Sequence, residues 1–152
     1  MEPKFVSKPA FVMVGMKYHG QNKNNEIPQM WGEFMKHTEE FERVINPTVC
    51  YGACDHVNET TGVFDYLAAF EVNSEAAAPK GMDRWDIPAN EYAVFTCTLP
   101  TIHAAFDYIY GTWLPQSGYK RAPGAEFELY DESFEVNDPD SPLYLYIPVK
   151  KA

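Results

Sequence analysis

The residue types best suited to chemistry lie near the end of the chain. In the segment 127–130, strict alternation places Glu128 and Tyr130 on one face of a strand. The last apolar segment alternates in the same way and directs Tyr144 and Tyr146 to a common face. If the two segments pair as a hairpin, we expect the acid and the three tyrosines to share one face.

The opposite face of the same hairpin is apolar. Phe127 and Leu129 point away from Glu128, and leucines alternate with Tyr144 and Tyr146 in the final segment. Because a helix covers the apolar face of a sheet, we expect Phe127 and Leu129 to meet a helix.

A carboxylate among tyrosine hydroxyls fits two settings. On a wet surface it needs no partner. In a cleft, a partly buried carboxylate tends to protonate unless a bound cation supplies the missing charge. A cation at ~4 Å would gain about 4 kcal/mol at an effective dielectric near 20, before desolvation, and roughly 0.5–2 kcal/mol from each aromatic ring. The pattern alone leaves both settings open.

Other chemistries remain as alternatives. Glu128 beside a tyrosine hydroxyl would suit a hydrolase that activates water, and exposed aromatic side chains would suit a protein-interaction module. Cys50 and Cys54 share a strand face near His56, but no second ligand pair has zinc-site spacing. We expect no metal and no cofactor, with a histidine-ligated haem as the remaining cofactor alternative.

Composition limits the class of protein. The 152 residues suit one domain, and the formal charge of -10 opposes direct contact with nucleic-acid phosphates. Three cysteines make a closed disulfide framework improbable. No apolar run approaches the ~20 residues of a membrane span, and the start of the chain does not resemble a signal peptide. We expect a cytoplasmic protein without membrane contact.

The elements that position these residues follow one order twice. In the first half, about residues 5–72, an apolar run over 9–18 favours a strand. Apolar residues then recur at helical spacing from Ile27 to Ile45. Two further β-like runs, 48–54 and 62–72, complete a βαββ order.

A connector over about 73–84 separates this half from a second, about 85–150. The second half repeats the order with a strand over 91–97, a helical stripe from Ile102 to Leu114, and two strands that end the chain. We therefore expect a single α+β domain over residues 1–152, with a duplicated βαββ antiparallel sheet, two helices on one side and a ligand cleft between the halves.

Several motifs together resemble the GyrI-like, or AraC-type, effector-binding superfamily, most closely its integron-associated branch. They are Asn24-Asn-Glu-Ile-Pro-Gln-Met-Trp31, Tyr51-Gly52 with Phe64-Asp-Tyr66, Trp85-Asp-Ile-Pro88 with Tyr92-Ala-Val-Phe95, Thr112-Trp-Leu-Pro-Gln-Ser-Gly118, Phe127-Glu-Leu-Tyr-Asp-Glu132 and Tyr146-Ile-Pro-Val149. The resemblance spans nearly the whole chain. It implies the duplicated fold, a cleft between the halves and an acid on the penultimate strand.

Relatives of this kind form the ligand-sensing part of multidrug-responsive transcription regulators and bind lipophilic organic cations. The resemblance assigns the acid to Glu128 and aromatic pocket positions to Tyr51, Tyr66, Trp113, Tyr144 and Tyr146. Those regulators carry a helix-turn-helix segment before the sensing domain, whereas here the first predicted strand starts within about ten residues of Met1. We therefore expect a stand-alone sensor without its own DNA-binding domain, whose possible partner is a separate regulator protein.

Overall fold

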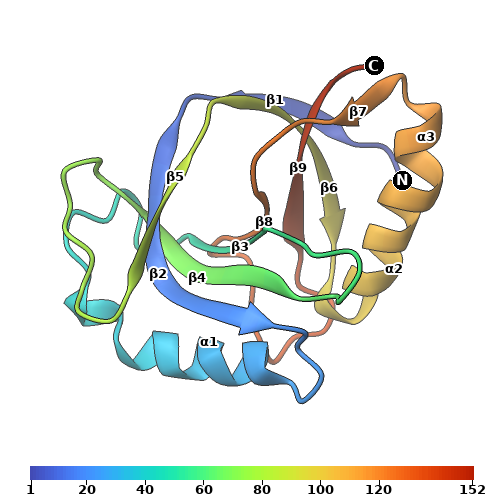
Figure 1. Ribbon diagram of the computed structural model, residues 1–152. Helices are drawn as coiled ribbons and strands as arrows, with labels where there is room; N and C mark the ends of the chain where they lie inside the picture. Colours follow the sequence, from blue (N-terminus) through green and yellow to red (C-terminus); the bar gives the residue numbers. More distant parts are fainter.

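The computed structural model describes residues 1–152 and contains one nine-stranded antiparallel sheet with two helical regions (Figure 1). The strands are β1 (Lys4–Lys8), β2 (Phe11–Gly20), β3 (Cys50–Asp55), β4 (Phe64–Val72), β5 (Asp83–Ile87), β6 (Asn90–Cys97), β7 (Tyr119–Arg121), β8 (Glu126–Tyr130) and β9 (Leu143–Lys151). The helical segments are α1 (Glu26–Lys36), η1 (Thr38–Glu40), η2 (Leu99–Thr101), α2 (Ile102–Tyr108), η3 (Ile109–Trp113) and α3 (Leu114–Gln116). The expected α+β class and the repeated βαββ order are confirmed.

The sheet order is β1-β6-β9-β8-β3-β4-β2-β5, with β7 added to β9. The central pair, β3 and β8, joins the two halves. A second junction closes the opposite side of the molecule, because β1 pairs with β6 and β2 pairs with β5 in one common register. The two pairings form a single long ladder that is interrupted and bent at Pro9 and Pro88, where proline cannot donate to the ladder. The result is a strongly curved sheet (Figure 1).

The two faces of the curved sheet bury different cores. On the face without helices lies the inner core, composed of Met13, Tyr51, Ala53, Leu67, Ala69, Ile87, Tyr92, Ala125 and Phe127. On the other face, α1 packs on β2 and β4, and α2 packs on β6 (Figure 1). Both helices lie outside the curve, so the prediction of two helices on one side is confirmed. The central strands β3 and β8 lie between the two helical regions on this face (Figure 1).

Helix α1 is shorter than its apolar stripe suggests. It begins after Asn25, which takes a left-handed backbone conformation, and its first turn carries the favourable acid Glu26. It ends at Lys36, not near Ile45 as predicted, and only a short 3-10 turn follows. The residue Phe41 lies beyond the helix yet still packs against the helix residue Phe34, with ring centroids 5.4 Å apart. The apolar spacing therefore reflected a shared core and not one continuous helix.

The second helical region runs as one body from α2 through α3. A five-residue π-helical segment, η3, lies in its middle. Such segments are uncommon in helices and often occur at functional sites. The predicted stripe from Ile102 to Leu114 corresponds to this region. Its residues Ala105 and Ile109 are buried in the core between the helix and the sheet.

Three strands were not predicted from the sequence. β1 and β7 are short, and β5 lies partly within the stretch interpreted as a connector over 73–84. All three sit at the rim of the curved sheet, and β1 and β5 belong to the bent ladder. No helix in the molecule has the length and apolar character needed to cross a bilayer.

Candidate ligand-binding site

Glu128 lies on the central strand β8, between the two helical regions. In the ladders of β8 it lies opposite Gly52 of β3 and Leu145 of β9. Cross-strand partners share a face, so Glu128 lies on the same face as the core under α2 and not on the face of the inner core.

The register corrects the predicted composition of this face. Tyr144 lies opposite Leu129, and Tyr146 lies opposite Phe127. Both tyrosines therefore point to the inner side, and the prediction that they share a face with Glu128 is wrong. Tyr146 instead stacks on Phe127, with ring centroids 4.8 Å apart and an interplanar angle of 15°.

The expected position of the helices relative to this strand is also wrong. Phe127 belongs to the inner core and Leu129 packs against that core, whereas the helices lie on the face of Glu128. Both faces of the sheet are buried here. The inner core covers the face of Phe127 and Leu129, and the helices lie on the face of Glu128. The acid is consequently largely buried on the face that carries the helices and does not lie on an open surface.

Two tyrosine hydroxyls converge on one oxygen of Glu128. Tyr130 donates to Oε1 at 2.7 Å, and Tyr66 from β4 donates to the same atom at 2.9 Å. Trp31 from α1 donates its indole Nε1 hydrogen to the Tyr66 hydroxyl at 3.0 Å. The Trp31 ring also meets the Tyr130 ring edge-on at 5.6 Å between centroids. We call Glu128, Tyr66, Tyr130 and Trp31 the acid box.

The other aromatic residues assigned by resemblance lie elsewhere. Tyr51 is in the inner core, and its hydroxyl donates to Glu71 at 3.3 Å. Trp113 packs against Phe95 in the core under α2, with centroids 5.1 Å apart. Of the predicted site residues, the structure brings Tyr66 and Tyr130 to Glu128. It does not bring Tyr51, Trp113, Tyr144 or Tyr146 into hydrogen-bonding contact with the acid.

Glu128 is a largely buried acid with no cationic partner. None of the ion pairs in the molecule includes it. Burial raises the pKa of Glu128 to about 7, the hydroxyls of Tyr130 and Tyr66 oppose this rise, and the nearby charge of Glu126 adds to it. Its second oxygen, Oε2, has no hydrogen-bond partner within the chain. The acid is therefore held neutral or poised to ionise near pH 7.

The tyrosines of the acid box remain protonated donors. Burial raises the pKa of both Tyr66 and Tyr130, and the neighbouring charge of Glu128 raises it further. Their hydroxyls hold Oε1 in place and leave Oε2 for another donor or for the charge of a cation. Carboxylate and aromatic faces together are the groups that bind organic cations.

Sequence reasoning missed two residues of this site as functional candidates. Trp31 was interpreted as part of an amphipathic stripe, and Gly52 as part of an apolar strand. A glycine inside a strand often marks a close approach of another group, and that signal was present at Gly52. The position of Trp31 over a central strand depends on how α1 crosses the sheet, which the stripe does not define.

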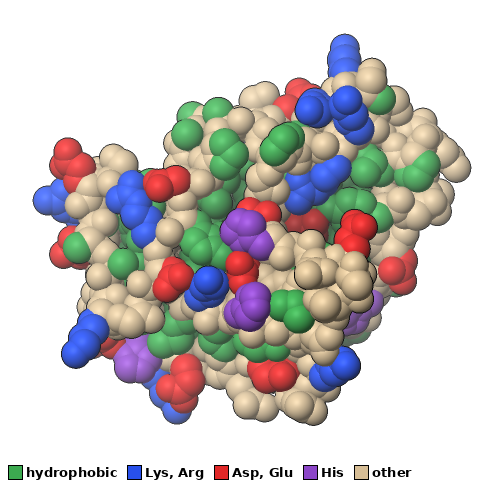
Figure 2. Space-filling view, viewed as in Figure 1, with side chains coloured by type: hydrophobic (Ala, Val, Ile, Leu, Met, Phe, Trp, Pro, Cys, Tyr) green, Lys and Arg blue, Asp and Glu red, His purple; other side chains and the backbone are tan.

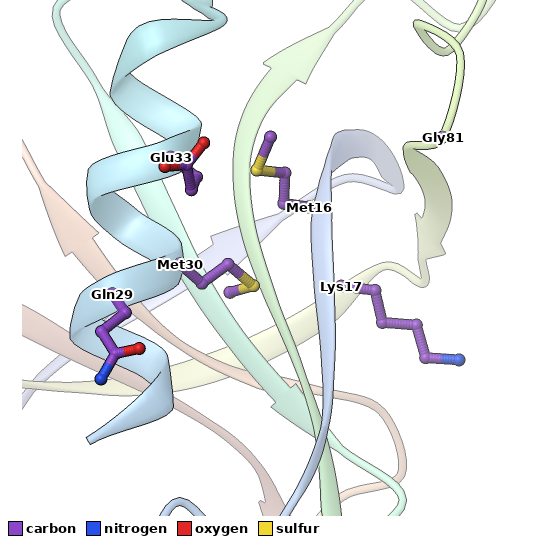
Figure 3. Close-up of a pocket in the computed structure, with 6 residues that line it drawn as sticks. All are labelled: Met16, Lys17, Gln29, Met30, Glu33 and Gly81. Carbon is purple, nitrogen blue, oxygen red and sulfur yellow. The ribbon is translucent and has the colours of Figure 1, made fainter. Parts of the chain in front are cut away.

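Glu128 lines neither of two hollows that open beside the helices and β8. The first, of about 450 Å³, lies between α1 and β2 (Figure 3). Met30 projects from α1 toward β2 and Met16 projects from β2 toward α1, while Lys17 points away. The second, of about 400 Å³, lies beside β8 and includes Glu126. The side chains of Trp31, Tyr66 and Tyr130 surround Glu128 and leave it only partly exposed.

The cysteines show no sign of nucleophilic activation. Burial raises the pKa of Cys50 to about 11 and that of Cys54 to about 12, so both remain thiols at neutral pH. No group of three or more His, Cys, Asp or Glu side chains is arranged to hold a metal ion.

Acidic and basic side chains are interspersed over the face shown in Figure 2.

The fold agrees with the comparisons with known proteins. The profile of a family described as integron-associated effector binding protein matches residues 4–149. The chain belongs to this family. Family membership confirms the resemblance inferred from the motifs.

A curated relative is the transcriptional regulator BrlR of Pseudomonas aeruginosa, which is 39% identical over 152 residues. The match covers 98% of this chain and 56% of BrlR, so the chain spans little more than half of that regulator. Members of this effector-binding family are thus related to regulators of transcription.

Solved structures show the same fold at low sequence identity. The C-terminal domain of EcmrR has a TM-score of 0.72 at 15% identity, covering 99% of this chain and 98% of that one. SAV2435, solved with bound tetraphenylphosphonium, has a TM-score of 0.69 at 15% identity, covering 99% and 94%.

Proposed function

We propose that this protein binds a lipophilic organic cation between α1 and α2, in a groove that opens over Glu128, with the positive charge of the ligand against this acid. The observation that carries the proposal is a largely buried carboxylate with no cationic partner and one oxygen free of hydrogen bonds, enclosed by Trp31, Tyr66 and Tyr130. A bound cation would provide the positive partner that Glu128 lacks within the chain.

The rings of the acid box supply the apolar part of binding. A monovalent aryl cation would make cation–π contacts of roughly 0.5–2 kcal/mol each with these rings, in addition to the burial of its own apolar surface. Glu128 would supply the preference for positive over neutral ligands. That SAV2435 was solved with a tetraarylphosphonium supports this ligand class.

Entry of such a ligand requires Trp31 to move. Its ring contacts Tyr130 and its indole is bonded to Tyr66, so it closes the groove over Glu128. The ring belongs to the surface helix α1 and is only half-buried. A rotation of this side chain, or a small shift of α1, therefore exposes Glu128 without disrupting the inner core.

The test is calorimetric titration at pH 8 with tetraphenylphosphonium, with neutral triphenylphosphine oxide and with anionic tetraphenylborate. We expect the wild type to bind the cation at least about tenfold more tightly than the neutral compound, and Glu128→Gln to lose most of that preference. The exposed variant Glu91→Gln is the matched control and should retain it. Equal affinities for cation and neutral compound in the wild type would overturn the electrostatic part of the proposal.

The same groove also fits a weaker candidate function, a hydrolase. Glu128 with a pKa near 7, beside tyrosine hydroxyls, has the properties of a general base for water. Recovery of unchanged ligand after long incubation supports binding without turnover for that compound. Product formation that disappears in Glu128→Gln would favour the hydrolase.

We further propose that the ligand-bound state of this domain is recognised by a separate regulator protein. The chain matches about half of a transcription regulator, and the match includes the whole predicted sensing fold. Co-purification of a DNA-binding partner that depends on tetraphenylphosphonium and on Glu128 would support this. A protein-interaction module without a ligand would instead bind its partner equally well in Glu128→Gln.

A further inference from the structure

A hollow of about 400 Å³ lies at the Glu126 end of β8, two residues along the strand from Glu128. Both halves of the molecule line it. Cys54 and the β3–β4 loop belong to the first half, while Tyr110, Arg121 and Glu126 belong to the second. Its volume lies within the range of ligand sites, at their smaller end.

Glu126 repeats the arrangement of Glu128 inside this hollow. The two acids are separated by one residue on β8, so their side chains share a face and their Cα atoms lie about 7 Å apart. Tyr110 from η3 donates its hydroxyl hydrogen to Oε1 of Glu126 at 2.6 Å. No hydrogen bond reaches the other oxygen, Oε2. Each acid is therefore held by tyrosine on one oxygen and is open on the other.

Arg121 only partly compensates Glu126. Its nearest guanidinium nitrogen is 3.7 Å from Oε1, which is beyond hydrogen-bonding distance. The guanidinium instead donates to the Tyr110 hydroxyl at 3.1 Å and to the carbonyl oxygen of Ala122. The side chain of Glu126 is 17% exposed, so its charge is partly desolvated.

The electrostatics of the hollow favour a second positive charge. Asp55, Glu59 and Glu126 face a single arginine across it, and His56 is bonded to Asp65 outside the hollow. Burial raises the pKa of Glu126, while the nearby charge of Glu126 raises that of Glu128. Two desolvated carboxylates this close repel each other, and two ligand charges would relieve both.

We propose that Glu126, Tyr110 and the adjoining hollow form a second subsite of the ligand groove, and that the ligand carries a hydrogen-bonding cationic group, such as a primary ammonium, a few ångströms from its bulky cation. This inference rests on the proposed function, because the bulky cation occupies the position at Glu128. The second group donates to the free oxygen of Glu126. The class of ligand is thus a dication with one aromatic, lipophilic end and one small polar end.

The test compares three phosphonium probes of nearly equal size at pH 8. They are (3-aminopropyl)triphenylphosphonium, butyltriphenylphosphonium and (3-carboxypropyl)triphenylphosphonium. Calorimetry on the wild type should show the aminopropyl compound binding about tenfold more tightly than the butyl compound, because a charge-assisted hydrogen bond contributes more than its loss of solvation. In Glu126→Gln the ratio of the two affinities should fall to about one, and in the control Glu91→Gln it should stay near ten.

Each other result overturns the inference. Equal affinities for the aminopropyl and butyl compounds in the wild type would leave the proposed function intact and remove the second subsite. An unchanged ratio in a folded Glu126→Gln, checked by its circular dichroism, would place the ammonium elsewhere. Preference for the carboxypropyl compound would assign the hollow to anion recognition by Arg121. Failure of all three probes to bind would overturn the cation-binding function together with this subsite.

Discussion

Gly52 lies directly opposite Glu128 in the β3–β8 ladder, and the space where its side chain would stand is occupied by the hydroxyl of Tyr66. A Cβ atom at Gly52 would be 2.0 Å from Tyr66 Oη and 2.7 Å from Glu128 Oε1. The glycine thus allows Tyr66 to reach from β4 across β3 to the acid on β8. The acid box can therefore assemble only because Gly52 has no side chain.

Gly52→Ala should therefore damage the site more than the fold. The added methyl group displaces the Tyr66 hydroxyl and separates it from Glu128, and we expect the affinity for tetraphenylphosphonium to fall at least about tenfold, the equivalent of one charge-assisted hydrogen bond. Gly32→Ala is the matched control, since a Cβ there meets no atom within 4 Å. It should leave affinity unchanged and stabilise α1 by up to about 1 kcal/mol. Full affinity in Gly52→Ala would show that Tyr66 does not hold the acid for binding.

Cation binding should release a proton near pH 7. Because burial raises the pKa of Glu128 to about 7, the free protein is mostly protonated there at pH 6 and mostly ionised at pH 8. A cation binds the ionised form, so we expect affinity to rise about tenfold from pH 6 to pH 8 and then level off. Titrations in buffers of different ionisation enthalpy measure the proton released. A pH-independent affinity would mean that Glu128 is not the group that meets the cation.

Glu128→Gln should make the free protein more stable at alkaline pH. The native pKa lies above the unfolded value, so the native state binds more protons and wild-type stability falls as pH rises from about 4.5 to about 7. The neutral amide avoids this loss and still accepts both tyrosine hydroxyls. We expect a gain of up to about 3 kcal/mol at pH 8 that vanishes by pH 4. Denaturant unfolding at the two pH values measures it, and a less stable variant at pH 8 would contradict a destabilising carboxylate.

Asp65, near the start of β4, links this strand to β2 and to the β3–β4 loop, through His19 Nδ1 at 2.6 Å and His56 Nδ1 at 2.9 Å. Burial acts to raise the pKa of Asp65, but the two histidines and Lys17 outweigh it and lower the pKa below its ordinary value. The stabilisation is therefore complete above the unfolded pKa of about 3.9 and is lost as pH falls through the lower native value.

Asp65→Asn should accordingly cost about 1 kcal/mol at pH 6, a modest figure because both histidines are well exposed to solvent. The difference from the wild type should shrink below about pH 4. The exposed substitution Asp107→Asn is the control and should have no comparable effect. Thermal unfolding over this pH range is the measurement, and a difference that grows on acidification would contradict the sign.

Trp31 should report ligand entry by fluorescence. Its indole donates to Tyr66 and its ring touches Tyr130, so a ligand that reaches Glu128 must change its surroundings. In a variant that keeps Trp31 and replaces Trp85 and Trp113 by Phe, we expect tetraphenylphosphonium to shift or quench the emission. The complementary variant that keeps only Trp85 should respond weakly, because Trp85 packs against the inner core. A larger change in the second variant would place the ligand on the inner side of the sheet.

Much of the fold followed from the sequence, since the βαββ order depends on local periodicity and on breakers. The alternation within β8 and within β9 also assigned each residue correctly to one of two faces. The two strands pair as the predicted hairpin, but their register did not follow from the sequence, because the connection from Asp131 to Pro142 is too long for turn geometry to set it. A shift by one residue moves every side chain to the other face, and this placed Tyr144 and Tyr146 on the wrong side of Glu128.

The bent ladder has a consequence for how the chain folds. It pairs Lys4 with Val94 and Gly15 with Asp83, contacts that close very long loops before any local stabilisation is gained. In each half an outer strand pairs with a strand from the other half of the chain, β1 with β6 and β2 with β5. A fragment ending after β4 should therefore lack a stable native state. We expect the intact chain to unfold in one cooperative step and to refold slowly, in milliseconds to seconds, as proteins dominated by long-range strand pairing do.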